Sequence, residues 1–305
     1  MIDVYNLTNL ENNTSVFYGI GSNVWQTWVK PRGCTLVSFF VLGAGGGGGA
    51  GASSSSGSTR SGGAGGASGG ISKCVIPAYL IPDRMYVLVG MGGLGGQPTL
   101  SNGSSGSTGE ISYISFDTNT TPTNVLLGSG NSVAGAGNGG IVGSANAVAG
   151  VASTIFTQPN GLLSYYSIPT LTAGANGGNG GNAAQNGTSA TISNIVTGGS
   201  GGAGVTSTSL NGANLTGSGI IPTLTGGIAT TTQATNGITS FSERLISRKE
   251  SLYFLGGAGG FSNNVGIGGI GGNGSYGCGG GGGGAGTTGG NGGNGGNGLI
   301  IVTCY

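Results

Sequence analysis

The sequence has 305 residues, of which 76 are glycine and only 5% are charged, with a formal net charge of +1. This weak charge excludes the basic surface that attracts nucleic acid or anionic lipid, so nucleic-acid binding is not expected. The longest apolar run, residues 35–44, has about half of the roughly 20 residues that a membrane-spanning helix needs, so no membrane insertion is expected either. Disorder goes with high charge and low hydrophobicity, so the chain is expected to fold.

Short β-strands are predicted at several places along the chain. The strongest run, residues 34–42, is rich in β-branched and aromatic residues and is predicted to be buried on both faces. The other predicted strands are residues 15–18, 71–76, 85–89, 110–116, 124–127 and 299–303, separated by proline and by Gly/Asn/Ser clusters. No segment has clear helical periodicity. The best candidate, residues 240–255, is expected to form a short helix or a charged loop.

Glycine-rich tracts connect the predicted strands. They cover residues 43–70, 90–109, 134–150, 173–204 and 256–298. Such tracts are flexible linkers by default, but these leave one strand and return to another, and two of them repeat Asn-Gly-Gly. A period of three matches the polyproline II helix, which has 3 residues per turn. We therefore predict a bundle of polyglycine II helices, with a flexible linker as the alternative. Asparagine would face outward or bridge, and valine at Gly292 or Gly293 would disrupt contacts between helices.

The residues that most enzymes need are scarce. Histidine is absent and only seven acidic residues exist, which removes the usual general acid–base and nucleophile-activating groups. Glu110 and Asp117 flank one predicted strand and would lie about 23 Å apart, too far for a glycosidase pair. The G-x-G-x-x-G match in residues 43–48 lacks the acidic residue about 20 positions later that binds ribose. We predict no catalytic residue and no cofactor.

The four cysteines are Cys34, Cys74, Cys278 and Cys304. Their spacing is too wide for a local zinc motif, and no histidine completes one, so no metal is expected. Cys34 and Cys304 lie in apolar runs near the two ends of the chain. They are interpreted as buried thiols or as a disulfide pair, and buried thiols are favoured.

Two tryptophans precede a predicted Pro-x-Gly turn. Trp25 and Trp28, if exposed, could stack on sugar rings or aromatic partners; if buried, they would anchor the first strand and the turn at Pro31 and Gly33. Burial of at least one is favoured. These four residues are therefore assigned structural roles, as are Gly292 and Gly293.

Residues 28–33, the strand at 35–42 and the Gly-Ala-Gly-Gly-Gly tract that follows resemble the glycine-rich domain of bacteriophage and other viral structural proteins. The Cys278 region, the Asn-Gly-Gly triplets and the terminal strand fit the same pattern. The resemblance implies an all-β fold: a jelly-roll or tumour-necrosis-factor-like β-sandwich with an inserted polyglycine II bundle, similar to phage tail-fibre-tip adhesins. It divides the chain into an N-terminal strand or attachment segment, 1–24, and a glycine-rich domain, 25–305, with a variable insert at 128–255.

These observations predict a non-enzymatic structural protein on a virion surface, such as a fibre, spike, decoration protein or tip adhesin, that serves assembly, host attachment or both. The expected partners are other copies of the chain, with a trimer favoured, other virion proteins and a host-surface glycan or protein; the receptor-binding residues stay unknown. The alternative is a cellular extracellular matrix or filament protein, so the expected location is a virion surface or the extracellular space. A polysaccharide depolymerase would need a close pair of acidic residues.

Overall fold

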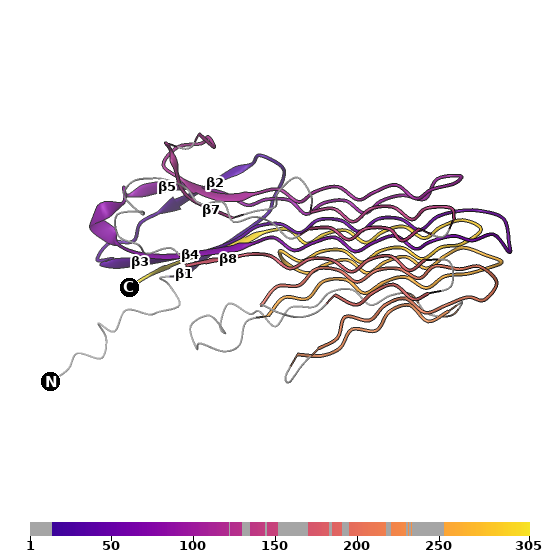
Figure 1. The fold of residues 1–305 in the computed structure, drawn as a ribbon. Helices are drawn as coiled ribbons and strands as arrows, with labels where there is room; N and C mark the ends of the chain where they lie inside the picture. The colour runs from indigo at the N-terminus through magenta and orange to yellow at the C-terminus, as the bar shows by residue number, and fades with distance from the viewer. Residues whose placement is uncertain are drawn as a thin grey trace.

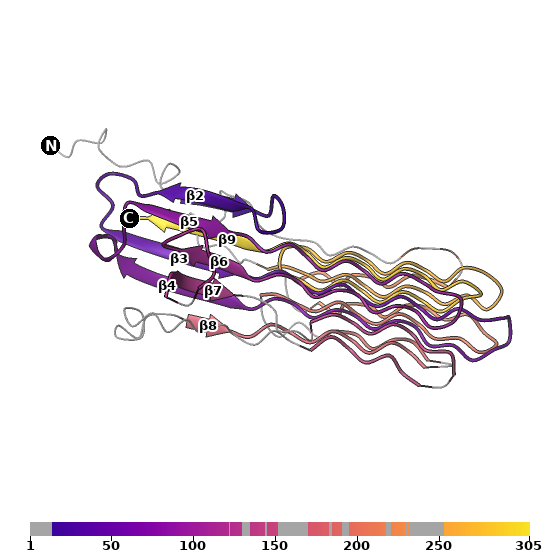
Figure 2. The same cartoon turned by 90° about the horizontal axis from the view of Figure 1, so that it is seen from above.

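The computed structural model describes residues 14–121, 123–129, 135–143, 145–151, 170–182, 185–190, 195–217, 221–229, 231, 233 and 253–305. Within these residues there are β-strands and one 3-10 turn, η3 (Ala78–Leu80), but no α-helix. The molecule is elongated: the strands gather at one end, and a bundle of undulating, side-by-side chain segments extends from them (Figures 1 and 2).

The strands form two antiparallel sheets. The first sheet has the order β1 (Thr14–Tyr18), β9 (Leu299–Cys304), β3 (Leu36–Leu42), β4 (Ile71–Pro77) and β8 (Thr170–Thr172). The second has the order β2 (Trp25–Val29), β5 (Arg84–Leu88), β6 (Ser112–Ser115) and β7 (Val125–Ser129). The two sheets pack face to face, which confirms the predicted all-β sandwich.

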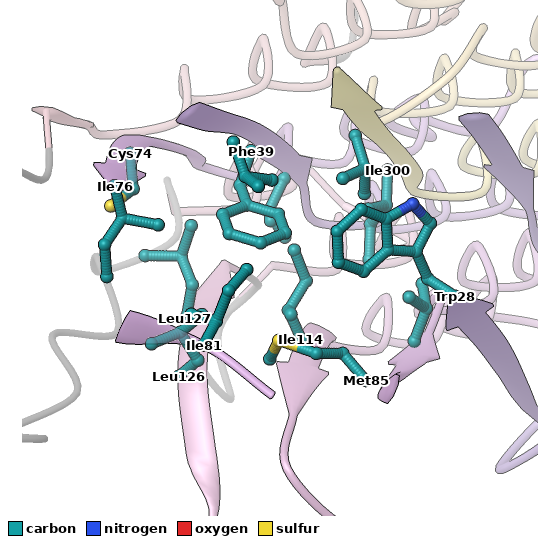
Figure 3. Packing of buried hydrophobic residues seen from close by; sticks show 14 of the residues in the cluster. Trp28, Phe39, Cys74, Ile76, Ile81, Met85, Ile114, Leu126, Leu127 and Ile300 are labelled. Atoms are coloured by element: carbon teal, nitrogen blue, oxygen red, sulfur yellow. The ribbon is translucent and has the colours of Figure 1, made fainter. Parts of the chain in front are cut away.

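The sandwich core lies between the two sheets and is apolar (Figure 3). Trp28, from the second sheet, is only 4% exposed. Its ring packs edge to face against that of Phe39, from the first sheet, with ring centroids 6.1 Å apart. On β3, Val37, Phe39 and Val41 point into this core. Leu36 is exposed and Phe40 is half-buried, so the prediction that β3 is buried on both faces is wrong for most of the strand.

A second apolar cluster joins the outer face of the first sheet to the base of the bundle. Leu42, Ile71 and Leu299 from the strand ends pack against Phe254 and Cys278 from the bundle. Alternate side chains of a strand face opposite sides of a sheet, so the bundle covers the outer face only where the strands run into it. This contact fixes the bundle to the sandwich.

All the predicted strands exist, with ends shifted by a few residues. β2 and β8 were not predicted as strands, and β8 has only three residues. Residues 14–18 form β1 and pair with the C-terminal strand β9, so they belong to the first sheet; residues 1–13 lie outside the described residues. So does most of the candidate helix or loop at 240–255.

Backbone hydrogen bonds identify the bundle as polyglycine II. In the segment 45–53, successive residues donate their N–H groups in turn to the segments 290–296, 61–67 and 101–107, at N–O distances of 2.7–3.0 Å. Every third residue returns to the same neighbour, which is the repeat of a helix with 3 residues per turn. The carbonyls of the same segment accept from three further neighbours, at 93–96, 137–140 and 280–286. This segment is therefore enclosed by six others, and the polyglycine II prediction is confirmed.

The flexible-linker alternative is wrong because the glycines are packed backbone against backbone. A Cβ atom on Gly292 would lie 2.0 Å from the carbonyl oxygen of Gly48, and one on Gly293 would lie 2.0 Å from that of Gly272. Described parts of the predicted insert 128–255 belong to the same bundle, since Gly65 donates to the carbonyl of Gly178.

Asparagine side chains bridge helices at the rim of the bundle. Oδ1 of Asn294 accepts from the N–H of Gly95 at 2.8 Å, and Oδ1 of Asn297 accepts from that of Gly92 at 2.9 Å. A helix at the rim lacks a neighbour on one side, so the side-chain amide takes the place of the missing carbonyl. Of the two predicted roles for asparagine, bridging is the one these residues have.

Candidate functional site

The loops that connect neighbouring helices meet at the end of the bundle farthest from the sandwich (Figures 1 and 2). We call the described loops 54–59, 98–102, 263–267 and 286–288 the distal tip. Ser53, directly before the first of these loops, donates its N–H to the carbonyl of Ser101 in the second at 2.7 Å. Segments far apart in the sequence thus form one surface.

Arg60 is buried directly beneath the distal tip and is 0% exposed. Nη1 donates to the carbonyl of Ser54 and, at 3.0 Å, to that of Gly286. Nη2 donates to the carbonyl of Asn264 and to its Oδ1, both at 3.0 Å. The sole ion pair among the described residues joins Lys30 and Asp83. Arg60 is therefore a buried cation held by backbone and amide oxygens, and charge-assisted bonds of this kind are stronger than neutral ones.

Burial lowers the pKa of the Arg60 guanidinium, because the low-dielectric interior disfavours the charged form. Arginine nonetheless stays protonated in proteins. Its charge thus draws carbonyl oxygens from three tip loops to one point, and so fixes their relative positions.

Asn264 extends this network to further loops. Its Oδ1 also accepts from the N–H of Gly57 at 3.0 Å, and its Nδ2 donates to the carbonyl of Ser207 at 2.9 Å. The tip loops are thus tied to one another by buried and half-buried polar groups. A surface fixed in this way loses little conformational entropy on binding.

The distal tip exposes aliphatic and small polar side chains. Leu100 is 100% exposed, Val265 76% and Ile267 67%. The other tip side chains are mainly serine, threonine and asparagine. None of the four loops contains a charged residue; Arg60 directly follows the first loop and is buried beneath it. Such a surface can bind through apolar contact and neutral hydrogen bonds, without dependence on salt.

Comparison with protein families bears on this architecture. The model of a family described as a glycine-rich domain matches residues 21–305. The chain belongs to this glycine-rich domain family. No curated protein matches it.

The six residues predicted to be structural lie away from the distal tip of this glycine-rich domain. Trp28 is in the sandwich core, while Trp25, on the same strand, is half-buried. Pro31 and Gly33 form the turn before β3, where the N–H of Cys34 bonds to the Pro31 carbonyl at 3.4 Å. Gly33 has a φ of 81°, a conformation that favours glycine in such a turn. Gly292 and Gly293 are buried inside the bundle.

The acidic side chains that the structure describes bond to nearby groups in the sandwich and at the base of the bundle. Oε2 of Glu110 accepts from the N–H of Met91 at 3.0 Å, and Oδ1 of Asp117 accepts from that of Thr118 at 2.7 Å. Asp83 pairs with Lys30 at 3.0 Å. Among the described residues no three His, Cys, Asp or Glu side chains gather as metal ligands, and no described helix is long and apolar enough to span a membrane.

Cys34 and Cys304 form a disulfide, with their Cα atoms 5.6 Å apart. The favoured interpretation of these residues as buried thiols is therefore wrong: the pairing of β3 with β9 brings the two chain ends together. Cys74 and Cys278 are free and buried. Burial raises the pKa of the Cys74 thiol to about 11 and that of Cys278 to about 12.

Arg60 was not among the residues predicted from the sequence. It is the only charged residue in the tract 43–70, and a single charge in an uncharged, glycine-rich tract could have drawn attention to it. What no pattern in the sequence reveals is which distant loops supply the oxygen atoms that Arg60 contacts.

Proposed function

We propose that this glycine-rich domain is a non-enzymatic structural protein of a virion surface, in which the sandwich attaches to the particle and the distal tip binds a host surface. The observation that carries the proposal is the tip itself: Leu100, Val265 and Ile267 are exposed there, and Arg60 holds in place the loop that carries Val265 and Ile267. A stiff bundle presents such loops at a distance from the point of attachment, which suits an adhesin.

Two further features support this proposal, one bearing on the compartment and one on the type of sandwich. The Cys34–Cys304 disulfide fits an oxidising environment, because disulfides are rare in proteins that stay in a reducing cytosol. The first and last strands, β1 and β9, lie side by side, which suits a jelly-roll sandwich of the tumour-necrosis-factor type, as viral glycine-rich domains are expected to have.

Self-association through the sandwich end belongs to the same proposal. Leu36, Val75 and Tyr79 are exposed at that end, away from the bundle. Apolar side chains there offer a surface for identical subunits in a symmetric oligomer such as a trimer. Sedimentation of the purified chain should give a trimer mass, and a compact monomer at all concentrations would contradict this part of the proposal.

The location is tested by immunogold labelling of intact particles with antibodies against the bundle. We expect labelling without permeabilisation; labelling only after disruption would contradict a surface position. The role of the tip is tested by attachment of particles that carry Leu100→Ser with Val265→Ser. We expect reduced attachment, whereas the matched control Val29→Ser, at an exposed side chain of β2 in the sandwich, should leave attachment unchanged. Equal attachment of wild-type particles, particles with the tip double variant and control particles would contradict binding by the tip.

A further inference from the structure

Asn-Gly pairs recur throughout the bundle, and this dipeptide is the one most prone to lose its side-chain amide. In that reaction the backbone nitrogen of the glycine attacks Cγ of the preceding asparagine. Attack requires a glycine N–H free to leave its hydrogen bond and an asparagine whose backbone can turn from the extended polyproline II conformation, with ψ near about +145°. The described pairs begin at Asn102, Asn138, Asn176, Asn179, Asn186, Asn211, Asn273, Asn291, Asn294 and Asn297.

The bundle occupies the attacking nitrogen in nearly all of these pairs. The glycine N–H donates to a backbone carbonyl of a neighbouring helix, at 2.8–3.0 Å, after Asn102, Asn176, Asn179, Asn211, Asn273, Asn291, Asn294 and Asn297. After Asn138 the N–H of Gly139 donates to Oγ of Ser105 at 3.4 Å.

Asn294 shows how completely such a residue is held. The N–H of Gly295 donates to the carbonyl of Gly93 at 2.8 Å, while Oδ1 of Asn294 accepts from Gly95. The N–H of Asn294 itself donates to Oδ1 of Asn273 at 2.8 Å. Both the nucleophile and the group it would attack are therefore fixed, and both are fixed by the same neighbouring segment, 93–96.

Asn186 is the exception among the described pairs. Its side chain is exposed, and neither this side chain nor the N–H of Gly187 has a hydrogen-bond partner within the described part of the chain. The bonds on either side are present, since Thr188 donates to the carbonyl of Asn179 at 2.9 Å and Gln185 accepts from Gly204. The helix thus continues past Asn186, but the Asn186 side chain is exposed and the N–H of Gly187 is left unbonded within the described part of the chain.

We propose that Asn186 is a site of spontaneous deamidation, while the polyglycine II bundle protects its other described Asn-Gly pairs. Solvent base removes the proton from the Gly187 nitrogen, which bonds to Cγ of Asn186. The Cγ–Nδ2 bond breaks, and ammonia leaves with a proton from water. The resulting succinimide adds one water molecule at either carbonyl and opens to aspartate or isoaspartate. Nothing is oxidised or reduced. The product places a negative charge on the helix 185–190, whose residues carry none.

The test compares Asn186 with Asn294 in the full-length, disulfide-bonded protein at mildly alkaline pH. The protein is produced without N-glycosylation, because Asn186-Gly187-Thr188 is also a sequon. Peptide mass spectrometry follows the gain of about one dalton at each site, and isoaspartyl methyltransferase labelling reports isoaspartate. We expect Asn186 to react at least about tenfold faster than Asn294, the effect of one hydrogen bond on a rate. In denaturant the two rates should become similar.

Two variants complete the design. Asn186→Gln should abolish the labelling in its peptide and leave melting unchanged, which assigns the signal to this exposed side chain. Asn294→Gln is the matched control on a protected pair and should not alter the labelling of native protein. Equal deamidation rates at Asn186 and Asn294 in the native protein would overturn the proposal. So would a finding that Asn186 is protected in the native protein and reacts only in denaturant.

Discussion

The guanidinium of Arg60 donates to both the backbone carbonyl and Oδ1 of Asn264, each at 3.0 Å. The two residues are separated by 204 positions in the sequence. This contact joins the end of the loop 54–59 to the loop 263–267. Arg60 has no carboxylate partner among the described residues. The relative positions of the loops 54–59, 263–267 and 286–288 therefore depend on one side chain.

Replacing this side chain tests that dependence. We expect Arg60→Ala to lower the free energy of unfolding by about 2–4 kcal/mol, because several buried oxygen atoms lose a charged donor. Amide exchange at Gly57 and Asn264 should accelerate more than exchange in the sandwich. Denaturant unfolding and hydrogen exchange measure the two effects. Arg32→Ala, at an exposed arginine in the sandwich, is the control and should change neither; if Arg60→Ala behaved the same way, the tip would not depend on Arg60.

The close packing of the bundle is tested at Gly293. A Cβ at this position would lie 2.0 Å from the carbonyl oxygen of Gly272, so we expect Gly293→Val to cost at least about 3 kcal/mol or to prevent folding. Asn291→Ala, on the same helix but at its half-buried rim, should cost less than about 1 kcal/mol. Thermal melting compares the pair, and should the valine variant melt like the alanine variant, the helices would not be in contact.

The sequence predicts the parts of this architecture that are determined by side chains, and not the parts that are determined by contacts between backbones. Apolar runs bounded by proline and Gly/Asn/Ser clusters predicted β3, β4, β5 and β9, because β-branched and aromatic side chains favour strands. The Asn-Gly-Gly period predicted polyglycine II, because it reports the number of residues per turn. Nothing predicted that Gly48 lies beside Gly293, since contacts between glycine backbones leave no pattern of side chains. β8 is a strand of three residues and is too short to show alternation.

The disulfide was mispredicted for a related reason: its two cysteines meet only because β3 and β9 pair across the whole chain. We expect Cys34→Ser with Cys304→Ser to lower the free energy of unfolding by about 2–5 kcal/mol, because the bond links residues 270 positions apart and so restricts the unfolded chain. Melting of the oxidised protein, with and without reductant, measures this. Reductant should have no effect on the double variant; equal melting of wild type and variant under oxidising conditions would contradict a structural disulfide.

The two free thiols predict a dependence on pH. Burial raises the pKa of Cys278 from 9.0 to about 12 and that of Cys74 from 9.0 to about 11. The folded state thus favours the neutral thiols, so their contribution to stability is complete below pH 9 and is lost as the pH rises toward these values. Denaturant unfolding measured across this range should show less loss of stability for Cys278→Ser than for wild type. Parallel curves would mean that Cys278 is not buried.

Amide hydrogen exchange along residues 289–298 tests most directly whether the glycine tracts are a packed polyglycine II bundle. The N–H groups of Gly293 and Gly296 donate to Gly281 and Cys278, each at 2.8 Å, so they should exchange as slowly as the amides of Val41 and Ile300 in the sandwich, through global unfolding. Exchange of these glycines at the rate of an unstructured peptide, while the sandwich stays protected, would contradict the bundle.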